Sequence, residues 1–191
     1  MKDIFNNQTP LIVIDVQKGF DDPCWGERNN PQAEENIAKL LDEWRRMKRP
    51  VIHVHHCSTE TDSPLREDRP GNKVKDFAEP AEGEAVFKKN VNSAFIGTEL
   101  EPWLKDRACK TLVIVGLTTD HCVSTSVRMA ANLGFQVFLI SDATAAFSKN
   151  GPDGTYYSAE QIHSVHLASL NKEFCSVCDT STILSQSSSE N

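Results

Sequence analysis

The chain of 191 residues lacks any apolar run near the roughly 20 residues that a membrane-spanning helix needs. Its N-terminus lacks the basic flank, apolar stretch and small-residue cleavage site of a secretory signal. We therefore expect a cytoplasmic protein with no membrane partner. Because no Pro-, Gly- or Ser-rich stretch divides the interior, residues 1–191 are expected to form a single domain, with a disordered tail over about 185–191.

The chain is also short of basic charge. It has 20 Lys and Arg against 27 Asp and Glu, a formal net charge of -7 and a pI near 5.4. The basic residues are scattered and form no stripe, so nucleic acid is not an expected partner.

The six cysteines show no regular disulfide framework, and free thiols are the better interpretation in a chain of this length without a secretion signal. Cys175 and Cys178 form a C-x-x-C pair, which is compatible with redox chemistry or half of a zinc site. The pair lies in an expected terminal strand, and no second C-x-x-C or H-x-H follows it. Buried structural cysteines are therefore favoured.

Short apolar runs alternate with amphipathic stretches, a pattern typical of βαβ units and a parallel sheet. The fold class is expected to be α/β: a three-layer α/β/α Rossmann-like fold with a six-stranded, mostly parallel sheet in the order 3-2-1-4-5-6. Strands are expected at residues 10–16, 50–56, 84–89, 111–117, 136–142 and 174–177, and helices at 31–47, 99–107, 122–133 and 158–170. The polar segment 57–83 is too long for a simple connector, and such segments are often lids or binding loops.

Three chemically capable residues fall where expected strands end. Asp15 lies near the end of the first strand, Lys89 closes the third, and Cys122 follows the fourth at the start of a helix. Ligands bind beyond the carboxyl ends of strands in open α/β sheets. A thiol at a helix start is exposed to the helix dipole, which favours thiolate.

The segments around these residues resemble known motifs. "VIDVQKGF", "FKKNVNSAFIGTEL" and "IVGLTTDHCVSTSVRMAANLGFQVFLISDATAAF" are similar, in order, to the aspartate, lysine and nucleophile motifs of the isochorismatase-like cysteine hydrolase superfamily. That superfamily includes nicotinamidase, N-carbamoylsarcosine amidohydrolase and the ureidoacrylate and biuret hydrolases. With "DGTYYSAEQIHSVHLASLNKEFCSV", the resemblance covers residues 10 to about 177.

The resemblance implies acyl transfer at Cys122, with Asp15 accepting the thiol proton and Lys89 balancing the local charge. Strand alternation puts Lys88 on the opposite face. The resemblance also implies a cis peptide at Leu117–Thr118 and an oxyanion hole formed by the N–H groups of Thr118 and Cys122.

The same resemblance narrows the substrate class. The vinyl-ether branch lacks the nucleophilic cysteine, so Cys122 favours cleavage of a C–N bond. The metal-binding D-x-H-P-x-x-H stretch of nicotinamidases is absent after the second strand. His53 and His56 remain possible ligands, and we expect His55 to point away from both. We therefore expect no metal and no cofactor.

The expected substrate is a small amide or ureide, and the resemblance favours a homodimer or homotetramer. Substrate-binding residues are expected among Gln17, Phe20, Trp25, Asn92, Phe95, Thr119 and Phe147, although each could equally be a core residue. Two alternatives stay open at this point. One is nicotinamidase-type or isochorismatase-type hydrolysis, and the other is a non-catalytic binding or redox-sensing protein that uses its thiols.

Overall fold

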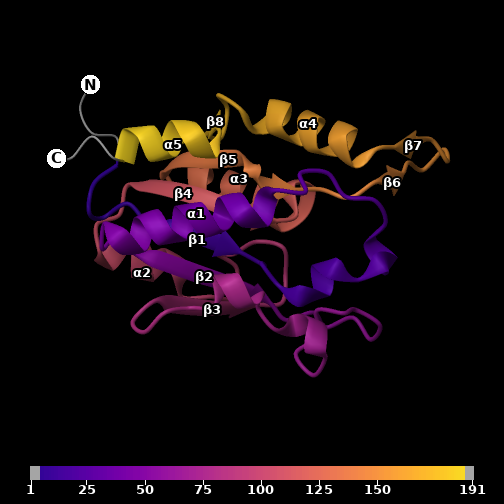
Figure 1. Ribbon diagram of the computed structural model, residues 1–191, viewed down its shortest axis with the longest axis horizontal. Coiled ribbons are helices and arrows are strands. Elements are labelled where there is room, and N and C mark those ends of the chain that lie inside the picture. The colour runs from indigo at the N-terminus through magenta and orange to yellow at the C-terminus, as the bar shows by residue number, and fades with distance from the viewer. Residues whose placement is uncertain (1–4, 188–191) are drawn as a thin grey trace.

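A computed structural model describes residues 5–187, and its centre is one six-stranded parallel sheet (Figure 1). The sheet order is β3-β2-β1-β4-β5-β8, and every neighbouring pair is parallel. The strands are β1 (Leu11–Ile14), β2 (Val51–His56), β3 (Ala85–Lys89), β4 (Thr111–Leu117), β5 (Gln136–Ala145) and β8 (Ser176–Cys178). The predicted α/β class and strand order are confirmed, with β8 as the sixth strand of the sheet.

Helices cover both faces of the sheet, as its strand sequences require. The four residues of β1 are all buried, and alternate side chains belong to different hydrophobic clusters. Leu11 and Val13 pack with α1 (Ala33–Arg46) and α5 (Thr180–Ser187). Ile12 and Ile14 pack on the other face with α2 (Leu100–Asp106), α3 (Ser124–Asn132) and α4 (Ala159–Leu170). The result is the expected three-layer arrangement.

Several boundaries differ from the expectations. The first strand ends at Ile14, before Asp15, which has a positive φ of 52°. A small antiparallel hairpin of β6 (Lys149–Asn150) and β7 (Tyr156–Tyr157) was missed because each strand has two residues, too few for an alternation signal. Helix α5 extends to Ser187, so residues 185–187 are helical where a disordered tail was expected. Residues 188–191 lie outside the described part of the chain. Within residues 5–187, no helix is both long and apolar enough to cross a bilayer.

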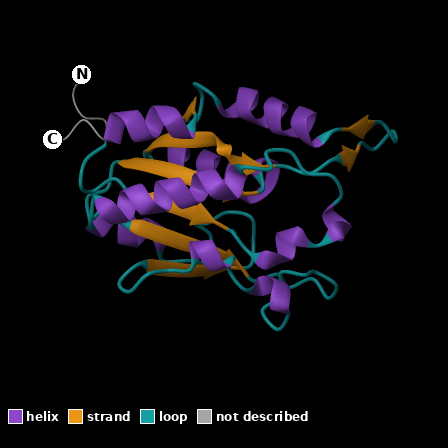
Figure 2. Ribbon diagram, in the orientation of Figure 1, coloured by secondary structure: helices purple, strands orange, loops and turns teal. Residues whose placement is uncertain are grey.

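The segment 57–83 is a long connection that contains only the short 3-10 turns Pro70–Asn72 and Asp76–Ala78 (Figure 2). It is fastened to the loop after β1 by the backbone bonds from Lys18 N to Lys73 O (2.8 Å) and from Lys75 N to Val16 O (3.0 Å). Figure 2 shows the loop after β1 and the first part of the segment at the end of the sheet toward which the strand arrows point. The segment then runs back to the start of β3, which is parallel to β2. This arrangement brings the segment to the edge where the candidate residues lie.

Candidate active site

Asp15, Lys89 and Cys122 meet at the carboxyl edge of the sheet although they come from separate elements. Cys122 lies in the π-helical turn Thr119–Val123 that joins β4 to α3. The Lys89 ammonium donates to Asp15 Oδ2 at 2.7 Å and to Cys122 Sγ at 3.2 Å. The side chains of Asp15 and Lys89 are fully buried. The structure therefore brings the three predicted catalytic residues into one cluster.

The Lys89 side chain reaches Asp15 across the end of β2, which lies between β3 and β1 in the sheet. It ends β3, the edge strand, and lies in register opposite His56, the last residue of β2. Its Nζ is 3.1 Å from His56 Nδ1 on the way to Asp15. Lys88 points the other way, is exposed and pairs with Glu67. The two lysines thus separate by strand alternation as expected.

Burial and neighbouring charges oppose ionisation of the Cys122 thiol. Burial and the Asp15 carboxylate raise the pKa of Cys122 well above its usual range, and Lys89 opposes this only in part. Burial of the thiol thus opposes the thiolate that the helix start was expected to favour. Burial also raises the pKa of Asp15, and the charge of Lys89 partly opposes that rise.

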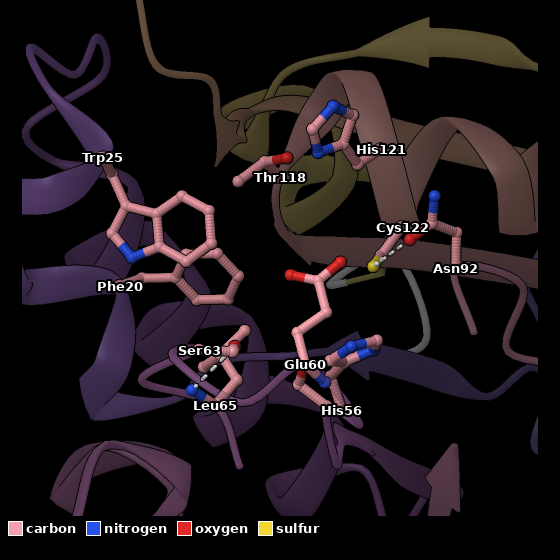
Figure 3. Close-up of a pocket in the computed structure, with 11 residues that line it drawn as sticks. Phe20, Trp25, His56, Glu60, Ser63, Leu65, Asn92, Thr118, His121 and Cys122 are labelled. Carbon is pink, nitrogen blue, oxygen red and sulfur yellow. Dashed lines mark hydrogen bonds between the residues drawn. The ribbon is translucent and has the colours of Figure 1, made fainter. Parts of the chain in front are cut away.

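Two further atoms of the cluster, the Cys122 thiol and Asp15 Oδ1, differ in their hydrogen bonding. The Cys122 thiol donates to Asn92 Oδ1, at 3.7 Å (Figure 3). Asp15 Oδ1 is buried and has no hydrogen-bond partner in the structure. A buried carboxylate oxygen without a donor is costly, and here it leaves one Asp15 oxygen open to accept a proton.

His56 belongs to the cluster, although the sequence suggested it only as a possible metal ligand. Because an ammonium can only donate, His56 Nδ1 accepts from Lys89 and the imidazole is neutral. Burial and the Lys89 charge lower the pKa of His56 accordingly. A hydrogen bond with the Val91 backbone acts the other way and raises the pKa of His56.

The other two histidines of β2 lie on the opposite face of the sheet. His53 and His55 are neighbours, with ring centroids 6.3 Å apart, and His53 bonds to Glu84 at 2.8 Å. The expectation that His55 points away from both His53 and His56 is wrong, since a strand repeat of two places residues 53 and 55 together. His56 is the one that faces the site.

The spacing of Asp15, His56 and Cys122 is close enough for a shared metal ion, because one ligand atom of each lies within 4.8 Å of the others. The Lys89 ammonium, however, is within 3.2 Å of an atom of all three. A second cation at that point would meet a fixed positive charge at contact distance. The cluster therefore fits an ion pair with a thiol better than a metal centre.

A pocket of about 290 Å³ opens above Cys122 (Figure 3). Its walls come from the loop after β1, the end of β2, segment 57–83, the loop after β3 and the turn after β4. The lining residues are Phe20, Trp25, His56, Ser58, Glu60, Ser63, Leu65, Asn92, Thr118, His121 and Cys122. This volume suits a small molecule.

Three of the seven predicted substrate-binding residues, Phe20, Trp25 and Asn92, line this pocket. Thr118 lines it as well, and the Leu117–Thr118 peptide is cis, as the resemblance implies.

The other four are placed outside the pocket lining. Phe95 stacks on Phe135 in the core, Thr119 bonds to His163 at 2.8 Å, and Phe147 stacks behind Phe20 and Trp25. The Gln17 amide donates to the carbonyls of His56 (3.0 Å) and Asn72 (2.7 Å) and accepts from His56 N (2.9 Å). These contacts use the Gln17 side chain to join β2 to segment 57–83.

Sequence reasoning missed five pocket residues besides His56: Ser58, Glu60, Ser63, Leu65 and His121. His121 directly precedes the cysteine, and that position was a usable signal. The other four belong to segment 57–83. The sequence indicated a lid or binding loop for this segment, but it did not indicate which of its residues face the site.

The C-x-x-C pair has the character of packed thiols. Cys175 is buried, and burial raises the pKa of Cys175 to about 12 and of Cys178 to about 11. Such thiols form little thiolate at neutral pH, which favours the structural interpretation.

Comparisons with known proteins agree with this geometry. Residues 9–182 match the isochorismatase domain. An uncharacterised isochorismatase family protein of Bacillus subtilis is 48% identical over 174 residues, which span 91% of this chain and 93% of the relative. A crystal structure of an isochorismatase-family protein from Chromobacterium violaceum superimposes with a TM-score of 0.92 and 43% identity, covering 95% and 94% of the two chains.

Two further relatives have names that state an activity. Nicotinamidase 3 of Arabidopsis thaliana is 28% identical, with 88% of this chain and 83% of that protein covered. Ureidoacrylate amidohydrolase of Agrobacterium fabrum is 32% identical over 54% of this chain and 45% of its own length. With the domain match spanning most of the sequence, this chain belongs to the isochorismatase family of hydrolases.

Proposed function

We propose that this chain is a cysteine-dependent hydrolase that cleaves a C–N bond of a small amide, ureide or carbamoyl compound through a thioester on Cys122. The observation that carries the proposal is the buried contact of one ammonium with both a carboxylate and a thiol at the floor of a pocket. The named activities of the nicotinamidase and ureidoacrylate amidohydrolase relatives support amide chemistry.

The first half of the reaction forms the thioester. Asp15 takes the thiol proton through its unpaired Oδ1 as the sulfur attacks the substrate carbonyl. The Lys89 ammonium contacts the sulfur at 3.2 Å and stabilises the negative charge that develops on it. The backbone N–H groups of Thr118 and Cys122 receive the oxyanion. The carbonyl re-forms, Asp15 returns its proton to the leaving nitrogen, and ammonia or an amine departs.

The second half releases the acid. A water molecule enters where the amine left, Asp15 removes one of its protons, and the hydroxide attacks the thioester carbonyl. The C–S bond breaks and Asp15 returns the proton to sulfur, which restores the neutral thiol. The raised pKa values of Asp15 and Cys122 suit this cycle, because the proton passes between two groups that both resist ionisation.

Ammonia release across a panel of carboxamides and ureides tests this proposal. Turnover should be lost in Cys122→Ala and retained in Cys109→Ala, which removes another buried thiol outside the pocket. Intact-mass spectrometry of a rapidly quenched reaction should show the acyl group on wild-type protein only. A panel hydrolysed equally by Cys122→Ala would refute the mechanism. The expected homodimer or homotetramer stays a prediction that analytical ultracentrifugation checks.

A further inference from the structure

The wall of the pocket carries one formal charge. Of the eleven lining residues, Glu60 is the only acid, and none is lysine or arginine. Figure 3 shows the Glu60 carboxylate turned into the pocket, between Cys122 on one side and Phe20 and Trp25 on the other. A ligand held against Cys122 therefore lies next to a negative charge.

The backbone of Glu60 is fixed, whereas its carboxylate is open to a ligand. Its N–H donates to Ser58 Oγ at 3.2 Å, and its carbonyl accepts from Ser63 N at 3.3 Å. Among residues 5–187, no ion pair or hydrogen bond engages the carboxylate. Its charge also reaches the buried cluster, because it acts to raise the pKa of His56.

The aromatic side chains of the pocket also favour a positively charged ligand. Phe20 and Trp25 lie with ring centroids 5.2 Å apart across the pocket from Cys122. Aromatic faces attract cations, and Trp does so most strongly. A carboxylate and two aromatic rings on the walls around one small space form an environment for a positively charged group, and an unfavourable one for a carboxylate.

We propose that Glu60 is a specificity-determining residue that selects small amides bearing a positive charge at the end away from the scissile carbonyl. This inference rests on the proposed function, since it names the substrate class of the same site. In the bound state the carbonyl lies over Cys122, and an ammonium or guanidinium group lies between Glu60 and the aromatic pair.

Three amides with the same two-carbon spacer provide the first test: β-alaninamide, 3-hydroxypropanamide and succinamate, which end in an ammonium, a hydroxyl and a carboxylate. Wild-type protein should prefer β-alaninamide over the neutral amide by about fivefold in kcat/KM, the size of one partly exposed charge pair. Glu60→Gln should remove that preference, and Glu60→Lys should shift it toward succinamate. Glu82→Gln, the same change at an exposed site at the amino end of β3, should leave it intact.

A second test needs no turnover. Methanethiosulfonates bearing either an ammonium or a sulfonate react with thiols, and modification of Cys122 is followed by mass spectrometry of its peptide, which separates it from Cys24 and Cys57. The rate of Cys122 modification by the cationic reagent, divided by the rate with the anionic reagent, should fall about fivefold in Glu60→Gln. In Glu60→Lys this ratio should fall below 1. The Glu82→Gln ratio should match wild type.

The two tests fail separately. If no amide is hydrolysed but the labelling ratio changes as described, the proposed hydrolase function is wrong and the charge selectivity of the pocket holds. If amides are hydrolysed but Glu60→Gln leaves both the substrate preference and the labelling ratio unchanged, the role of Glu60 is overturned and the hydrolase proposal stands.

Discussion

The Lys89 ammonium pairs with the Asp15 carboxylate at 2.7 Å, with both side chains withdrawn completely from solvent. The pair joins the edge strand β3 to the central strand β1 across the end of β2. Two isolated charges at these positions would each cost several kcal/mol to desolvate. The pair therefore governs the stability of this edge of the sheet as well as the charge beside Cys122.

Replacement of Lys89 by Met should destabilise the fold by about 3–5 kcal/mol, because a buried carboxylate would lose its partner. The double variant Lys89→Met with Asp15→Asn should recover most of that loss, since both charges are then absent. Urea denaturation followed by circular dichroism measures these differences. Lys88→Met serves as the control, and its exposed side chain predicts a change within about 0.5 kcal/mol. Equal losses for the two lysines would contradict the assignment of Lys89 to the buried pair.

Asp15→Asn should separate catalysis from thiol reactivity. Without its proton acceptor, kcat for amide hydrolysis should fall by about 100-fold or more. The negative charge of Asp15 raises the pKa of Cys122 while Lys89 lowers it, so the variant should contain more thiolate. Iodoacetamide should therefore alkylate Cys122 faster at pH 8 than in wild type, as read from its peptide by mass spectrometry. A parallel fall in hydrolysis and alkylation would argue that Asp15 serves only to hold the structure together.

The sequence predicted the sheet and the reactive cluster because both depend on local patterns. β1 is buried on both faces and reads as a continuous apolar run, and parallel strands bring Asp15, Lys89 and Cys122 to one edge whatever the loops do. The resemblance pointed to Lys89, and strand alternation predicted that only one of Lys88 and Lys89 reaches the site. The same rule, applied wrongly to β2, misplaced His55.

The pocket walls depend on contacts between segments far apart in the chain. Asn72 donates to the carbonyls of His56 (2.8 Å) and Leu65 (2.7 Å), and Gln17 joins the same carbonyl of His56. These contacts decide which side chains of segment 57–83 face Cys122. Composition alone does not encode them, so Glu60 was not predicted. Gln17 was predicted at the right place but for a role in substrate binding, because a polar residue after a strand resembles a ligand contact until its partners are known.

Acidification should destabilise the protein through His55. Its Nε2 is buried without a hydrogen-bond partner, and burial, followed by the charges of His53 and Lys88, lowers its pKa from 6.5 to about 4. Because the folded-state pKa is below the unfolded value, only the unfolded chain takes up this proton between pH 6.5 and about 4. The free energy of unfolding should fall by about 2–3 kcal/mol across that window after allowance for partial solvent screening.

His55→Gln provides the check on this pH dependence. The urea midpoint of unfolding is measured for wild type and variant at steps from pH 7 to pH 4. As the pH falls, the midpoint should decrease less steeply in the variant than in wild type. His166→Gln is a suitable comparison, because burial lowers the pKa of His166 as well. An unchanged slope in His55→Gln would mean that other groups carry the acid sensitivity.

Gly116 sets how closely β1 and β4 approach beside the site. It lies in register opposite Ile14, the residue before Asp15, and just ahead of the cis peptide at Leu117–Thr118. Its φ is 125°, and a Cβ there would lie 2.0 Å from the Ile14 carbonyl oxygen. Gly116→Ala must therefore push the two strands apart, and we expect a loss of at least about 3 kcal/mol in stability.

The matched control for Gly116→Ala is Gly154→Ala. Gly154 also has a positive φ, of 82°, but a Cβ there would have no neighbour within 4 Å. The stability lost in Gly154→Ala should therefore be limited to backbone strain of about 1–2 kcal/mol. If Gly116→Ala folds, the displaced strand should also move Asp15 away from Lys89 and Cys122, which lowers kcat for amides that Gly154→Ala still hydrolyses normally. Equal stability losses for both variants would show that the close approach of β1 and β4 is not what requires glycine at position 116.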